Sequence, residues 1–151
     1  MQTVTPFLWF NGRLDEATKF YTSIFKKSKV SNVAHGPKGK IMCATIKING
    51  QEFMAFDGGP HFKFTPAFSF FIECKTQKEV DYYWEKLSKG GKKQMCGWLQ
   101  DKFGLSWQVV PTALGKFLSD SDAAKSGRAL NAMLKMKKID IKGLDRAFNK
   151  G

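Results

Sequence analysis

The chain has 151 residues, of which 42% are hydrophobic and 14% aromatic, with 14 phenylalanines and 4 tryptophans. This composition excludes a disordered polar chain and predicts one domain, residues 1–151, whose core needs no disulfide or metal to hold it together. The formal net charge of +12 is typical of proteins that meet polyanions. The basic residues are spread along the whole chain, however, so we expect solvated surfaces and do not favour nucleic acid as a partner.

Three cysteines, Cys43, Cys74 and Cys96, stand far apart in the sequence. They are too few and too scattered for a disulfide framework or a pair of metal ligands, and an odd count fits a reducing compartment. No signal peptide precedes the first expected strand, and no apolar run reaches the roughly 18 residues that span a bilayer. We therefore expect a soluble cytoplasmic protein with no membrane contact.

The first part of the chain predicts a strand, a helix and three further strands. Apolar residues at Leu14, Ala17 and Tyr21 have the spacing of a helix with one buried face. The dipeptide Asn49-Gly50 supplies the two positive φ angles of a tight hairpin turn. The expected elements are a strand at 3–10, the helix at 14–25, a weak strand at 29–35, and the hairpin strands at 41–48 and 51–56.

The same order of elements returns after residue 66. Thr76 and Glu79 have the spacing of a capping box, in which each side chain binds the other's free backbone N–H. The helix that they open ends at Gly90-Gly91. Strands are expected at 67–73, 93–96, 98–101 and 106–110, and Pro111 ends the last because it lacks the N–H that a strand ladder needs.

The two parts are copies of one structural unit. Superposing Glu16 on Glu79 also brings Leu8 onto Phe71, with strands, helix and buried positions in agreement. The predicted fold is α+β, with two βαβββ modules of curled mixed sheet and a helical C-terminal tail. The expected boundaries are about 1–60 for module one, 61–112 for module two and 113–151 for the tail, with tail helices at 114–118, 121–138 and 139–149.

Several motifs extend over nearly the whole chain. They are Thr5-Pro-Phe-Leu-Trp-Phe10, Gly50-Gln-Glu-Phe-Met54, Gly58-Gly-Pro60, Glu79-Val-Asp-Tyr-Tyr-Trp-Glu-Lys-Leu87, Cys96-Gly-Trp98, Gly104-Leu-Ser-Trp-Gln108 and Ala132-Met-Leu-Lys-Met-Lys-Lys-Ile-Asp-Ile141. With the duplicated module, they resemble the PhnB-like, or demethylubiquinone-methyltransferase-like, group of the vicinal oxygen chelate superfamily, which includes glyoxalases, bleomycin-resistance proteins and dioxygenases. The resemblance implies half-barrels that enclose a cleft, and a homodimer. Asp57 departs from the group's usual asparagine before Gly-Gly-Pro and places a negative charge at the cleft mouth.

The resemblance also implies where a metal would bind. Metal-dependent members carry His or Glu on the first and last strands of each module, and these positions fall near Pro6, near Met54 or Ala55, near 67–69, and at Gln108. None is a good ligand, since zinc, iron and manganese prefer imidazole, thiolate or carboxylate. His35 and His61 lie far apart in the pattern. We therefore expect no metal and no cofactor.

The methyltransferase label finds no matching motif. A site for S-adenosylmethionine commonly needs a glycine-rich turn between a strand and a helix of a parallel doubly wound sheet. Gly36-Pro-Lys-Gly39 lies in a meander loop, and Gly58-Gly59 precedes another loop. We therefore do not expect methyltransferase activity.

Alternation along the strands predicts the residues that line the cleft. Trp9, Trp84 and Trp107 are expected on the helix-covered faces, and the loop 61–64 is expected to act as a lid. The ligand-binding candidates facing the cleft are Leu8, Met54, Phe56, Ser69, Phe71, Ser106 and Gln108, with Cys96 and Trp98 near its rim and Asp57 at its mouth.

Other interpretations of these residues stay open. The cleft face is a filled core in one of them, without a pocket. In another, Cys96 is a nucleophile whose pKa a base or positive field lowers. In a third, Asp57 and Asp101 form an acid–base pair, although Asp is common in turns for local reasons.

A mostly apolar surface with a few hydroxyl and amide groups is typical of a small-molecule site. The favoured function is therefore binding of a small, partly apolar organic molecule in a metal-free cleft. The alternatives are a lyase, isomerase or dioxygenase whose unfamiliar metal site uses Gln108, Asp57 or His61, and a basic nucleic-acid-binding protein. Whether the chain is an enzyme, and with which catalytic residues, is left open.

Overall fold

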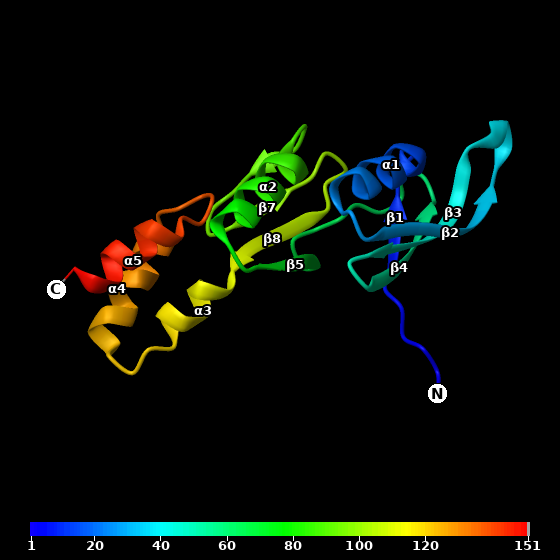
Figure 1. Ribbon diagram of the computed structural model, residues 1–151. Coiled ribbons are helices and arrows are strands. Elements are labelled where there is room, and N and C mark those ends of the chain that lie inside the picture. The colour runs from blue at the N-terminus through cyan, green and yellow to red at the C-terminus, as the bar shows by residue number, and fades with distance from the viewer. Residues whose placement is uncertain (151) are drawn as a thin grey trace. The chain divides into compact units, whose positions relative to one another are not determined.

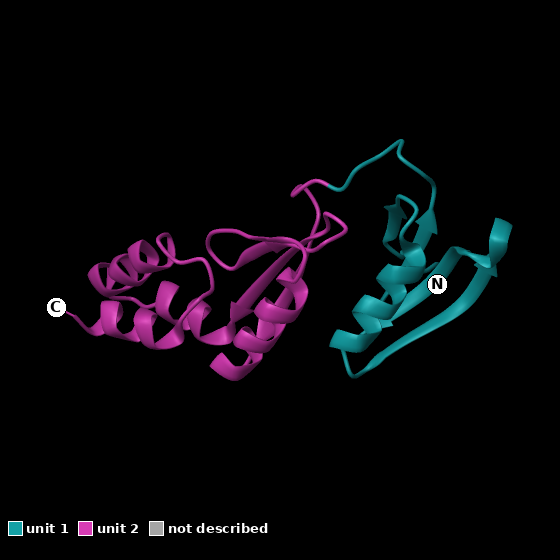
Figure 2. Cartoon of the chain, turned by 90° about the horizontal axis from the view of Figure 1, so that it is seen from above, with its two compact units in different colours: residues 1–64 teal, residues 65–151 magenta. Residues whose placement is uncertain are grey.

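Two four-stranded mixed sheets organise the chain in this computed structural model, which describes residues 1–150. Figure 1 shows the arrangement of strands and helices within each part of the chain. Each sheet belongs to its own unit, and the two units are shown in different colours in Figure 2. Unit 1 spans Met1–Phe64 and unit 2 spans Thr65–Gly151. Each unit has one helix packed on its sheet, and unit 2 also contains three C-terminal helices.

The elements of unit 1 follow the expected order of strand, helix and three strands. Its sheet order is β1-β4-β3-β2, and a short 3₁₀ turn, η1, joins β2 to β3. The bounds are β1 (Phe7–Phe10), α1 (Leu14–Ile24), β2 (Ser28–His35), η1 (Pro37–Gly39), β3 (Ile41–Ile48) and β4 (Gln51–Asp57).

Unit 2 repeats this arrangement and continues into three helices, α3, α4 and α5. Its sheet order is β5-β8-β7-β6. The bounds are β5 (Ser69–Cys74), α2 (Gln77–Ser88), β6 (Lys92–Lys93), β7 (Trp98–Gln100), β8 (Ser106–Pro111), α3 (Thr112–Leu118), α4 (Ala123–Met133) and α5 (Ile141–Asn149).

The two sheets have the same topology. In each, the first and last strands of the unit pair in parallel, and the remaining neighbours pair antiparallel. The α+β fold of two βαβββ modules with a helical tail, predicted from the sequence, is therefore confirmed.

The core of unit 1 lies between α1 and one face of its sheet. Leu14, Ala17 and Tyr21 of α1 are fully buried, as the helical spacing predicts. The sheet contributes Ile46 of β3 and Phe53 of β4, which are paired neighbours and both 0% exposed. Since alternate residues of a strand face opposite sides, this register fixes the faces of the whole sheet.

Two local motifs form as the sequence predicts. Asn49 and Gly50 have φ angles of 47° and 90°, which close the β3–β4 hairpin. At the start of α2, Thr76 accepts the backbone N–H of Glu79 at 3.2 Å. The reciprocal bond differs slightly, because Glu79 accepts the N–H of Lys75 at 2.8 Å, one residue before the cap.

A buried carboxylate shapes the turn between β7 and β8. Asp101 is 2% exposed, and its Oδ1 accepts the N–H groups of Phe103 at 2.9 Å and Leu105 at 3.1 Å. Its Oδ2 accepts the indole N–H of Trp107, the second residue of β8, at 2.9 Å. A buried charge is tolerated only when hydrogen bonds satisfy it, and here both oxygens are satisfied. Asp101 thus ties the turn to the strand that follows.

The helical tail, residues 112–150, packs around a small core of its own. Leu114 of α3, Ile139 of the segment before α5, and Leu144 of α5 are buried together, with Phe117 and Met133 against them. The second helix is capped by Asp122, which accepts the N–H groups of Ala124 and Lys125. None of the helices within residues 1–150 has both the length and the apolar character that a membrane span requires.

Some expected boundaries were wrong. The strand expected at 93–96 covers only Lys92–Lys93, because Cys96 and Gly97 turn the chain with φ angles of 60° and 81°. Their N–H groups donate to the carbonyls of Met136 and Lys137, at 2.8 Å each, instead of to a strand. The helix expected at 121–138 accordingly ends at Met133, since the residues beyond it lie along this turn.

We predict that Asp101→Asn destabilises the protein by about 1–3 kcal/mol, the usual cost of unsatisfied buried donors. An amide has one acceptor oxygen and places N–H groups against either the backbone donors or the Trp107 indole. Chemical denaturation in urea measures the loss. Asp120→Asn is the control, because its exposed side chain accepts only the N–H of Asp122 and an amide oxygen can do the same. Equal stability of the two variants would contradict this role of Asp101.

Candidate functional site

Three side chains form a row across the unit 2 sheet, on the face away from α2. Gln108 of β8 pairs with Phe71 of β5 on one side and with Trp98 of β7 on the other. Paired residues of neighbouring strands point to the same face of a sheet. The other face holds Trp107 and Val109, which are 2% and 0% exposed. We call Phe71, Gln108 and Trp98 the Gln108 row.

A hydrogen bond from Gln108 to Ser69 supports the central amide of this row. Gln108 Nε2–H donates to Ser69 Oγ at 3.0 Å, which orients the amide along the sheet. Ser69 pairs in turn with Ser106, the residue two before Gln108 on the same face. Ser106 is fully buried, and its Oγ has no hydrogen-bond partner within residues 1–150. The face therefore combines oriented polar groups with large aromatic rings.

The Gln108 row borders a hollow of about 350 Å³ within unit 2. Sheet residues form one side, and α3 with the end of α4 forms the other. All three members of the row line it, and so does Cys96. Its further lining residues are Glu73, Val110, Pro111, Thr112, Leu114, Gly115, Leu118 and Met133. This size fits a small organic ligand.

Cys96 lies in the turn that joins the sheet to the tail. Its thiol donates weakly to the carbonyl of Met133 at 3.7 Å, and its N–H binds the carbonyl of Met136. Gly97 beside it cannot be replaced without displacement, because a Cβ there would lie 2.8 Å from the carbonyl oxygen of Val109 and 2.9 Å from Ile139. Cys96 therefore anchors the tail, and no neighbouring base in these contacts supports its role as a nucleophile.

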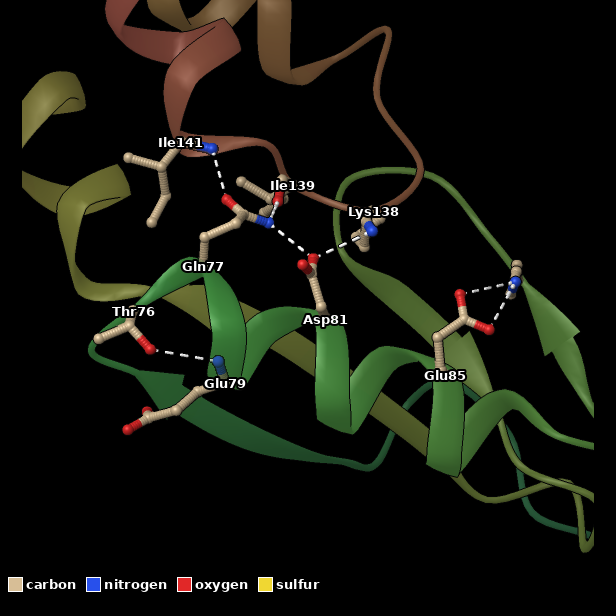
Figure 3. Close-up of polar contacts among 9 residues, drawn as sticks. Thr76, Gln77, Glu79, Asp81, Glu85, Lys138, Ile139 and Ile141 are labelled. Atoms are coloured by element: carbon tan, nitrogen blue, oxygen red, sulfur yellow. Dashed lines mark hydrogen bonds and ion pairs between the residues drawn. The ribbon is translucent and has the colours of Figure 1, made fainter.

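A polar latch holds the tail on α2, as Figure 3 shows. The Gln77 amide accepts the N–H of Ile141 at 2.8 Å and donates to the carbonyl of Ile139 at 3.0 Å. Asp81 accepts from Gln77 and pairs with Lys138, both at 3.0 Å. These hydrogen bonds and the Lys138 charge lower the pKa of Asp81. The latch fixes the segment between α4 and α5, and thereby supports the helical wall of the hollow.

Unit 1 carries an aromatic cluster on the corresponding face of its own sheet. Trp9 packs edge-on against Phe56 at 5.1 Å and Phe62 at 4.9 Å between ring centroids, and its indole N–H donates to Gly59 O at 2.9 Å. At Gly58 a Cβ would lie 2.1 Å from the Trp9 ring, so only glycine fits. The loop that follows β4 thus packs against Trp9 and covers this face of unit 1.

Strand alternation assigned Leu8 and Trp9 to the wrong faces. Leu8 is 5% exposed and pairs with Ala55, whereas Trp9 pairs with Phe56 on the opposite face. Three residues separate β1 from α1, but only two separate β5 from α2. β5 is longer than β1, and its connection to the following helix is one residue shorter. When α1 is aligned on α2, the residues of β1 are therefore matched to the wrong positions of β5. A shift of one residue in a strand moves every side chain to the other face.

The remaining candidates of unit 1 have separate surroundings. Met54 is 41% exposed, and Phe56 is half-buried against Trp9. Asp57 accepts the N–H of Gly12 at 2.6 Å, which ties the end of β4 to the β1–α1 turn. An asparagine oxygen can accept the same bond. The local roles of Asp57 and Asp101 give no support to an acid–base pair.

The sequence interpretation missed the whole helical wall and part of the sheet side, including Glu73 and Val110. Glu73 and Val110 follow Phe71 and Gln108 by two residues, so alternation alone could have identified them. Leu118 and Met133 come from the tail, and no periodicity within the modules indicates where the tail packs. Four of the ten candidates, Phe71, Cys96, Trp98 and Gln108, line the hollow, while Ser69 and Ser106 lie on the same sheet face beside it.

The sequence model of the 3-demethylubiquinone-9 3-methyltransferase family matches residues 2–110. The chain belongs to this family. The PhnB protein from Bacillus cereus, a solved structure, is 36% identical with a TM-score of 0.68, and the match covers 74% of this chain and 100% of that one. Membership of the PhnB-like group and of the vicinal oxygen chelate superfamily, predicted from the motifs, is confirmed.

Two more distant structures of other proteins share the fold. Protein PA1353 from Pseudomonas aeruginosa is 24% identical with a TM-score of 0.61, and the match covers 74% of this chain and 98% of that one. The fosfomycin resistance protein FosX from Listeria monocytogenes, solved with Mn(II) and sulfate, is 14% identical with a TM-score of 0.52, covering 71% and 89%. A comparison of this chain with the curated proteins found no match.

The metal implied by the superfamily does not fit the residues present. Within residues 1–150, no three His, Cys, Asp or Glu side chains are grouped as a metal site would require. The paired first and last strands place Trp9 beside Phe56 and Phe71 beside Gln108. Aromatic rings do not ligate divalent cations, and one neutral amide is a weak ligand.

We predict that alkylation distinguishes the three thiols. Burial, with a smaller contribution from the Glu79 charge, raises the pKa of Cys74 to about 12, so its reactive thiolate is scarce at pH 8. Cys43 and Cys96 are half-buried. Iodoacetamide followed by peptide mass mapping should find Cys43 and Cys96 modified, and Cys74 only after urea unfolding. Modification of Cys74 at the same rate in the folded protein would contradict the assignment.

Proposed function

We propose that the chain binds a small, partly apolar organic molecule in the unit 2 hollow, without a metal ion. The supporting observation is the Gln108 row, in which an oriented amide stands between two aromatic side chains at the edge of a space of about 350 Å³. Apolar walls supply affinity, and a few placed polar groups supply orientation. Because Gln108 Nε2 donates to Ser69 Oγ, the amide oxygen of Gln108 is the atom of this side chain that is left to accept a hydrogen bond from a ligand.

The methyltransferase activity in the family's name is not part of this proposal. Each sheet has a single parallel strand pair, unlike the doubly wound sheet that commonly binds S-adenosylmethionine. Gly36 precedes and Gly39 ends the turn η1 between β2 and β3, and Gly58-Gly59 packs against Trp9. These glycines have structural roles in unit 1.

Binding is tested with the neutral fluorescent probe N-phenyl-1-naphthylamine, whose emission rises in apolar sites. We expect saturable 1:1 binding that is the same in EDTA and in added Mn(II). Phe71→Ala should weaken it about tenfold, because an aromatic wall of the hollow is lost. Phe7→Ala is the matched control, since Phe7 is 55% and Phe71 56% exposed, each on the first strand of its sheet.

Two other outcomes of this binding experiment would contradict the proposal or favour an alternative. Equal affinity in the two variants would place the probe elsewhere and contradict the proposal. Binding that appears only with Mn(II) would favour the alternative of an enzyme with an unfamiliar metal site.

We also propose that the chain forms a homodimer, which the resemblance to the PhnB-like group supports. Sedimentation velocity over a range of concentrations should give the mass of two chains of 17.1 kDa each. A single species of one chain's mass at all concentrations would contradict this assembly.

A further inference from the structure

The charges around the hollow differ from those of the whole chain. The protein has a net charge of +12, and most of its lysines and arginines lie in unit 2. Among the residues that the structure describes, none of these cations lines the hollow, and Glu73 is the one charged residue that does. A space that excludes the chain's abundant cations while keeping a carboxylate has the wrong chemistry for an anionic ligand.

The position of Glu73 follows from the same register as the Gln108 row. It stands two residues beyond Phe71 on β5, so its side chain leaves the same face of the sheet, and it pairs with Val110. Its side chain is exposed and has no hydrogen-bond or ion-pair partner among the residues that the structure describes. The Glu73 carboxylate is therefore available to a ligand.

The two aromatic rings of the Gln108 row can also contact a cationic group. Phe71 and Trp98 are separated by Gln108, and two strand spacings amount to about 10 Å. This separation admits a group between two rings, whose faces attract cations electrostatically. Gln108 adds an acceptor oxygen at the base, and the indole N–H of Trp98 is the one ring donor of the row.

We infer that the ligand of this hollow is an organic cation, a protonated amine or quaternary ammonium attached to an apolar body. Phe71 and Trp98 face the cationic group, Glu73 neutralises it, and the Gln108 oxygen accepts an ammonium N–H. Leu114, Leu118 and Met133 meet the apolar part. This inference rests on the proposed function, since it names the class of molecule that the same hollow binds.

Three probes of one skeleton test the charge preference. At pH 7, 4-phenylbutylamine is a cation, 4-phenylbutanol is neutral and 4-phenylbutyrate is an anion. Each is titrated against the complex with N-phenyl-1-naphthylamine at fixed ionic strength, so that displacement reports affinity. We expect the amine to bind about tenfold more tightly than the alcohol, and the butyrate most weakly.

The variant Glu73→Gln removes the charge and keeps the size of the side chain. It should reduce the preference for the amine over the alcohol about tenfold, without changing the affinity for the alcohol. Glu52→Gln is the control, because Glu52 is an exposed strand carboxylate of unit 1. Its preference should equal that of the wild type.

The outcomes separate the two proposals. Equal binding of the amine and the alcohol, tighter binding of the butyrate, or an unchanged preference in Glu73→Gln would overturn the cation inference and leave the binding site in place. Failure of the fluorescent probe and of all three compounds to bind would overturn the proposed function together with the inference.

Discussion

The buried carboxylate of Asp101 is the constraint on which the candidate site depends. Three N–H groups converge on it, and one of them belongs to the Trp107 indole, so the turn and the start of β8 are fixed together. The turn sets the register of β7 against β8, and the register places Trp98 beside Gln108. A slip of one residue would send Gln108 to the face under α2 and bring Trp107 out in its place.

Much of the fold could be predicted because it follows from local chemistry. Asn49-Gly50, Thr76 with Glu79 and the helical spacing of α1 each determine structure within a few residues, and all form where expected. The duplication was visible because both copies repeat the order of these signals. The faces of β1 were not predictable in this way, because the strand-to-helix connection differs in length between the copies. Leu8 was misplaced for that reason.

The site depended more strongly on distant packing. The sequence interpretation found Phe71, Gln108 and Trp98 because strand alternation governs them. It missed the wall formed by the tail, which exists because Cys96 and Gly97 bind the carbonyls of Met136 and Lys137 and because Gln77 holds the start of α5. These partners lie far apart in the sequence, and no pattern in either segment indicates the other.

The family relationship and the local chemistry support one account of the chain. It retains the duplicated sheet of the vicinal oxygen chelate superfamily, but its paired first and last strands carry aromatic rings and an amide where a metal would need imidazoles or carboxylates. The tail covers part of the second sheet, so that a hollow of organic-ligand size forms within one unit. A ligand there would be held by apolar contact, one oriented amide and the charge of Glu73.

The most direct test is a crystal structure of the protein purified from cells without a chelator, inspected for density beside Gln108. We predict an organic molecule between Phe71 and Trp98, with a cationic group near Glu73 and no metal ion. A hollow filled by the protein's own side chains, or a divalent ion coordinated by Gln108, would contradict the account.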